Sequence, residues 1–143
     1  MPADPKDVLH RYLTDARDVL LWKLDGLSEY DVRRPLVPTG TNLLGLLKHT
    51  ASCTAGYFGT VFDRAFPDEQ SWFSDEHNAD MWATADETRE QIVELYRLAW
   101  AQADATIEAL PLDAVGRVPH WPEERADVTL HQIMVHMLAE TNR

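Results

Sequence analysis

The chain has a single cysteine, Cys53, among its 143 residues, so it cannot form a disulfide within one molecule. A small secreted fold held by disulfides is therefore excluded, and a reducing compartment fits the composition. No stretch approaches the roughly eighteen consecutive apolar residues of a membrane span, and residues 1–7 lack the apolar run of a secretory signal peptide. We therefore predict a cytoplasmic protein with no membrane partner.

Basic residues are also scarce, since 13 Lys and Arg stand against 24 Asp and Glu and give a formal net charge of −11. Phosphate backbones are bound by clustered cations, whereas the cations here occur singly or in pairs such as Arg33 and Arg34. We predict no nucleic-acid partner and interpret the acidity as an aid to solubility. The length fits a single domain covering residues 1–143.

Convincing strand patterns are missing too, and four segments instead repeat apolar residues every three or four positions. The first predicted helix begins at Asp4 and Pro5 and ends near Gly26. The second begins at Thr41 or Asn42 and continues to Phe62. The third begins with a capping box at residues 84–87 and stops near Ala109, before Pro111. The fourth begins at Thr129, whose side chain is expected to pair with Gln132.

These segments predict an all-α protein, a four-helix bundle. Its connections are long: residues 28–40, 66–82 and 112–127 are rich in Pro, Gly or charge, with a short helix expected near residues 68–74. The last helix reaches Arg143 without a capping Gly or Pro. We therefore expect the natural chain to continue beyond Arg143 with further residues of the same site.

The strongest candidate chemistry lies on the second and fourth helices. His136 and Glu140 are four residues apart and stack on the flank of an apolar stripe. His49 lies beside a strip of small residues that would let a ligand approach. Two imidazoles and a carboxylate suit a catalytic zinc or non-haem iron site, although spacing alone favours a packed, hydrogen-bonded core position for each histidine. Glu140 is also a candidate general base.

The remaining candidates are weaker. His10, His77 and His131 are expected to be exposed, and His120 is either exposed or lines a pocket beside Trp121. Cys53 is interpreted as a small core residue in preference to a nucleophile. The chain has no His-Glu-x-x-His motif, no phosphate-binding glycine loop and no Gly-x-Ser-x-Gly elbow.

Three stretches carry a resemblance to a known family: residues 22–28 (WKLDGLS), 34–49 (RPLVPTGTNLLGLLKH) and 136–143 (HMLAETNR). With them, nearly the whole chain resembles the DinB/YfiT-like superfamily of four-helix metalloproteins, in particular its actinobacterial branch. The resemblance implies a divalent metal, zinc first with nickel or iron as alternatives. The metal would be held by His49, by Glu140 and by a histidine that would follow Arg143. His136 is the candidate substitute for that third ligand.

The same resemblance implies a low-molecular-weight thiol, of the mycothiol type, as co-substrate of an S-transferase that joins the thiol to an electrophile. It also implies a homodimer, for which Trp72, Trp82 and Trp121 are candidate surface aromatics. The alternative prediction is a non-catalytic binding, sensor or dimerisation module that kept the fold without the chemistry.

Overall fold

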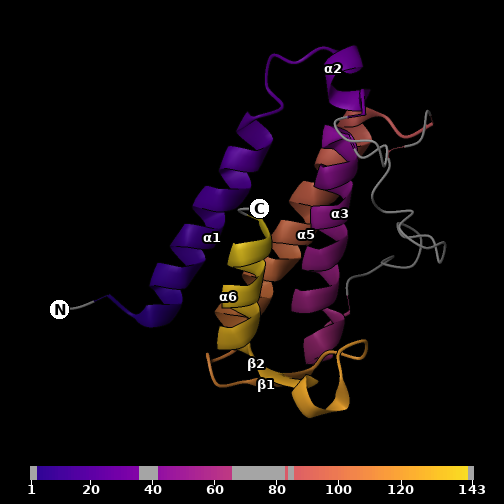
Figure 1. Ribbon diagram of the computed structural model, residues 1–143. Helices are drawn as coiled ribbons and strands as arrows, with labels where there is room; N and C mark the ends of the chain where they lie inside the picture. The colour runs from indigo at the N-terminus through magenta and orange to yellow at the C-terminus, as the bar shows by residue number, and fades with distance from the viewer. Residues whose placement is uncertain (1–2, 36–41, 66–82, 84–85, 142–143) are drawn as a thin grey trace.

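The computed structural model describes residues 3–35, 42–65, 83 and 86–141. Four long helices form the body of the molecule (Figure 1), which confirms the predicted all-α bundle. They are α1 (Pro5–Trp22), α3 (Leu43–Phe58), α5 (Arg89–Ala109) and α6 (Leu130–Thr141). Among the described residues there are also a short helix, α2 (Glu29–Arg33), and two single turns, η1 (Thr60–Phe62) and η3 (Glu123–Arg125).

Three of the four main helices begin where short polar side chains predicted a start. The Asp4 carboxylate accepts a hydrogen bond from the Lys6 backbone N–H at 2.8 Å, and Pro5 occupies the first turn of α1. Ahead of α6, Thr129 and Gln132 accept from each other's backbone N–H groups at 3.2 and 3.0 Å. These bonds satisfy donors that a helix cannot satisfy internally.

The third main helix begins later than predicted. Thr88, not Thr84, is its N-cap, and Thr88 and Gln91 form the reciprocal capping box at the start of α5. Residues 86 and 87 lie outside the helix, and the carboxylate of Glu87 reaches the Lys48 ammonium on α3 at 2.8 Å. The predicted box at residues 84–87 is therefore wrong, whereas the predicted end at Ala109 is confirmed.

The other differences lie at connections. The second predicted helix divides at Gly59, where α3 ends and η1 begins with a changed backbone direction. The predicted connection after Ser28 contains α2. The short helix expected at residues 68–74 lies outside the described residues.

The segment predicted as a loop after Leu112 contains a small antiparallel hairpin. Strands β1 (Val115–Arg117) and β2 (Asp127–Thr129) pair with Val115 opposite Thr129. Gly116 is required at this point because a Cβ there would lie 2.5 Å from the Val61 carbonyl oxygen of η1. The hairpin therefore packs closely beneath the end of α3 and leads directly into α6 (Figure 1).

The core is continuous between the helices, with α3 packed along α5 and with α1 packed chiefly on α6. On α3 the predicted apolar stripe is buried, from Leu44 and Leu47 to Phe58. Tyr12 and Val19, which the periodicity placed on the buried face of α1, are instead about half exposed. Burial of each large side chain contributes roughly 1.5–3 kcal/mol to folding.

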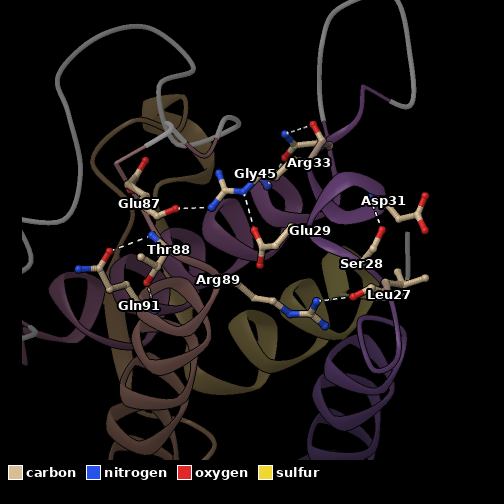
Figure 2. A network of polar contacts seen from close by, with 11 residues as sticks. Leu27, Ser28, Glu29, Asp31, Arg33, Gly45, Glu87, Thr88, Arg89 and Gln91 are labelled. Atoms are coloured by element: carbon tan, nitrogen blue, oxygen red, sulfur yellow. Dashed lines mark hydrogen bonds and ion pairs between the residues drawn. The ribbon is translucent and has the colours of Figure 1, made fainter.

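A polar network joins the ends of α2, α3 and α5 (Figure 2). The Arg33 guanidinium donates to the Glu29 carboxylate at 2.9 Å and to the Glu87 carbonyl at 2.6 Å. Arg89 donates to the Leu27 carbonyl (Figure 2) and also to the Leu24 carbonyl, both in the turn after α1. Because these bonds satisfy backbone carbonyls outside the helices, they fix the connections at this end of the bundle.

Candidate functional site

The cavity at the opposite end of α3 brings together the three residues predicted to bind metal. It has a volume of about 530 Å³ and lies between the C-terminal half of α3, the loop that follows β1, and α6. Its lining consists of His49, Ser52, Cys53, Gly56, Tyr57, Thr60, Val61, Pro119, His120, His136 and Glu140. His49, His136 and Glu140 therefore face a common space.

The sequence of α3 opens this space. His49, Cys53 and Tyr57 follow each other at intervals of four residues and so share one face of the helix. Ser52 and Gly56 also line the cavity, and their small side chains leave the volume that larger residues would fill. The strip of small residues beside His49 therefore lies where the sequence predicted room for a ligand.

Cys53 packs against the core, as predicted, and it also lines the cavity. Its side chain is partly buried and lines the cavity, with its Sγ 3.5 Å from His49 Nε2. The sulfur and the imidazole thus sit at the same wall, one helical turn apart.

Helix α6 supplies the opposite wall. Met134 and Met137 anchor it in the core, and His136 and Glu140 lie half-buried on its flank. His136 Nε2 and Glu140 Oε1 are 3.9 Å apart, which is too long for a hydrogen bond. The predicted stacking of this pair at four-residue spacing is thus present as a loose contact.

An aromatic cluster closes the cavity, and the sequence reasoning missed its centre, Tyr57. The Trp121 indole N–H donates to the Tyr57 hydroxyl oxygen at 3.2 Å, and His120 Nε2 lies 3.3 Å from the same oxygen. The His136 ring packs against Tyr57 and Trp121, with ring centroids 4.8 and 5.1 Å apart. Burial raises the pKa of Tyr57 above its ordinary value, although the Trp121 hydrogen bond opposes the shift.

The chemistry of the donors fits a divalent transition metal, because imidazole and carboxylate are common zinc and iron ligands. Within residues 3–35, 42–65, 83 and 86–141, however, no three His, Cys, Asp or Glu side chains are gathered as a metal-binding group. Binding of a metal by His49, His136 and Glu140 thus requires their side chains to rotate toward a common point within the cavity. The ligand assignment stays a prediction.

The predicted exposure of the remaining histidines is confirmed for some and wrong for one. His131 is exposed, as predicted, and His120 lines the cavity. The prediction of an exposed His10 is wrong, because His10 Nε2 lies 2.7 Å from the Asp104 carboxylate, which also accepts from Arg17. An acidic partner on α5, 94 residues away in sequence, turns His10 into part of the α1–α5 contact.

Four further residues were predicted at surfaces. His77, Trp72 and Trp82 lie outside the described part of the chain. Trp121 is partly buried and packs against Tyr57, a residue of the cavity lining. Among the described helices, none has both the length and the apolar character needed to cross a membrane.

A family model described as mycothiol-S-transferase matches residues 8–143, so the chain belongs to that family. The family is part of the DinB-like superfamily, and the helical bundle is consistent with that class. The match begins in the first helix and includes every residue of the cavity. No curated protein and no solved structure matches the chain.

Proposed function

We propose that this protein is a metal-dependent S-transferase that joins mycothiol, or a thiol closely related to it, to a small electrophile in the α3–α6 cavity. The observation that carries the proposal is the convergence of His49, His136 and Glu140 on one cavity in a chain of the mycothiol-S-transferase family. The cavity volume of about 530 Å³ is within the range of small-molecule sites.

The metal would be held by His49 from α3 and by Glu140 and His136 from α6. A divalent metal at such a site supplies Lewis acidity, which favours the thiolate form of a bound thiol. Zinc is the first expectation because imidazole, carboxylate and thiolate all suit it, with nickel and iron as alternatives.

The chain itself has three tasks in this reaction. The small residues Ser52 and Gly56 admit the thiol beside His49, and the rings of Tyr57 and Trp121 exclude water from one side. Glu140 acts either as a ligand or as the base that takes the thiol proton. No protein nucleophile is required, because the sulfur of the thiol makes the new bond.

The test begins with untagged protein, so that no added histidines bind metal. We expect about one divalent metal per chain by elemental analysis after reconstitution, and metal-dependent conjugation of mycothiol to an alkylating electrophile. Absence of bound metal both as purified and after reconstitution would contradict the proposal.

Glu140→Gln separates the two roles of Glu140. If Glu140 is a ligand, this variant loses metal. If Glu140 is the base, the variant keeps its metal, and the thiol reacts more slowly. Glu124→Gln, an exposed carboxylate beyond the cavity, is the matched control and should change neither quantity.

A second candidate function is a binding or sensor module, favoured by the lack of a gathered three-ligand group among the described residues. In that case, mycothiol raises the melting temperature through preferential binding to the folded state, and no electrophile is consumed. Catalytic conjugation of any electrophile would exclude this alternative.

A further inference from the structure

The Tyr57 hydroxyl is held in one orientation from several sides. An indole N–H can only donate, so the Tyr57 oxygen accepts the Trp121 bond and keeps its own proton for donation. The packing of His136 against the Tyr57 ring, at a centroid distance of 4.8 Å, restricts its movement further. Fixed donors of this kind stabilise charge without reorganising during a reaction.

The present neighbour of that hydroxyl is exchangeable. His120 Nε2 lies 3.3 Å from the Tyr57 oxygen, longer than a normal O–H···N bond, and His120 is exposed. An oxygen atom of a molecule entering the cavity can replace His120 as acceptor at small cost. The Tyr57 hydroxyl therefore points in a defined direction, and His120 competes only weakly with a ligand oxygen for its hydrogen bond.

We propose that Tyr57 is a catalytic residue whose hydroxyl donates a hydrogen bond to an oxygen atom of the electrophile. This inference rests on the proposed S-transferase function and extends it to a substrate class, electrophiles that develop negative charge on oxygen. An epoxide is the simplest example. The thiol gives its proton to a water molecule, sulfur bonds to an epoxide carbon, the carbon–oxygen bond breaks with its electron pair on oxygen, and that oxygen takes a proton from water, so that no net proton is gained or lost.

The kinetic test compares two electrophiles that differ in where charge develops. In styrene oxide the negative charge develops on oxygen, whereas in benzyl bromide it develops on the departing bromide. With mycothiol as thiol, Tyr57→Phe should lower kcat for styrene oxide by about 100-fold and leave the benzyl bromide rate nearly unchanged. Trp121→Phe, which removes the donor that orients Tyr57, should give a smaller loss with the same selectivity.

Tyr30→Phe is the matched control, since Tyr30 is largely exposed on α2 and distant from the cavity lining. It should change neither rate. Circular dichroism and melting temperature establish that each variant is folded. An equal loss for both electrophiles in Tyr57→Phe would overturn the inference, because the residue would then act on the thiol or on the fold.

A binding measurement separates this inference from the proposed function. Calorimetry compares S-(2-hydroxyethyl)mycothiol with S-ethylmycothiol, which lacks the oxygen. Wild type should bind the hydroxyl conjugate about fivefold to tenfold more tightly, and Tyr57→Phe should abolish that preference. If the preference is present without turnover of either electrophile, the transferase function fails, whereas the hydrogen bond from Tyr57 to the ligand oxygen stands. If wild type shows no preference, the inference is overturned.

Discussion

The two halves of α3 lie in contrasting surroundings. At its start, the contacts of a polar network are short: Arg33 donates to the Glu87 carbonyl at 2.6 Å (Figure 2), and the Lys48 ammonium lies 2.8 Å from the Glu87 carboxylate. At its end, the cavity residues make longer contacts, 3.3 Å between Tyr57 and His120 and 3.5 Å between Cys53 and His49. The His136–Glu140 contact across the cavity is longer still, at 3.9 Å.

This difference separates polar residues that hold the fold from polar residues that are arranged for a ligand. Short charge-assisted hydrogen bonds to backbone carbonyls are strong, and a ligand does not readily replace them. The longer contacts around the cavity are weaker, so a ligand in the cavity can replace them at small cost. Substitutions in the network should therefore change stability, and substitutions in the cavity should change binding.

The largest expected effect follows from His49→Ala. If His49 is a metal ligand, the variant should lose metal and transferase activity while the bundle stays folded, because the buried Leu stripe lies on another face of α3. Metal stoichiometry and melting temperature are the measurements, and His131→Ala, an exposed residue of α6, is the control. Unchanged metal content with reduced stability would show that His49 is a packed core residue. The cavity residues would then not differ in role from the residues of the network.

The next effect tests the network. Glu87→Gln removes the carboxylate that lies 2.8 Å from the Lys48 ammonium, a group only 9% exposed. We expect a loss of about 3 kcal/mol in the free energy of unfolding, the lower end for a broken buried pair, because the Glu87 side chain is 28% exposed. Lys48→Met removes the charge itself and should cost less. Urea unfolding measures both, and transfer activity per folded molecule should be unchanged; a large loss of that activity would contradict the separation.

Gly116→Ala tests whether the hairpin positions the cavity wall. Its new Cβ would lie 2.5 Å from the Val61 carbonyl oxygen and 2.8 Å from the Phe62 ring, so the strand must move away from η1. We expect a loss of about 2 kcal/mol, together with a change in Trp121 fluorescence and weaker thiol binding. Val115→Ala, at an exposed neighbouring position, is the control. Unaltered binding would show that the wall does not depend on this contact.

The smallest effect at neutral pH is expected for Tyr96→Phe, on the α1–α5 side of the molecule. Burial raises the pKa of Tyr96 above the ordinary value near 10, so its contribution to stability is complete below pH 10 and is lost as the pH rises toward the raised value. Loss of its bond to the Arg17 carbonyl should cost about 1 kcal/mol.

Denaturant unfolding at several alkaline pH values provides the measurement. The variant should show a weaker decline of stability above pH 10 than wild type, whereas Tyr30→Phe at an exposed position should decline as wild type does. An unchanged pH slope in Tyr96→Phe would mean that another group controls alkaline unfolding.

The four long helices were predictable because their signals are local. An N-cap side chain acts within three residues, and an apolar stripe repeats every turn. The start of α5 was not predictable in this way, since residues 84–87 carry the same type of capping pattern as Thr88 and Gln91. The Lys48–Glu87 contact joins residues 39 positions apart and belongs to tertiary structure. The hairpin was not predicted because each strand has three residues with one buried position, which in β1 is Gly116, too few for an alternating apolar pattern.

The site divides in the same way. The four-residue spacing of His136 and Glu140 and the small residues near His49 are visible in the sequence, and all these positions line the cavity. The role of Tyr57 was hidden because its partner, Trp121, is 64 residues away. Only the spacing of Tyr57, eight residues and so two turns beyond His49, pointed to a common face.

The hairpin between α5 and α6 also has consequences for evolution and engineering. The connection between its strands carries His120 and Trp121 to the cavity, yet the bundle core is built largely by the helices. Exchange of residues 119–125 would therefore remodel substrate selectivity while the helices retain the thiol site and the fold. This loop is the natural segment for a diversified library, and its variants should tolerate insertion better than any turn of α3.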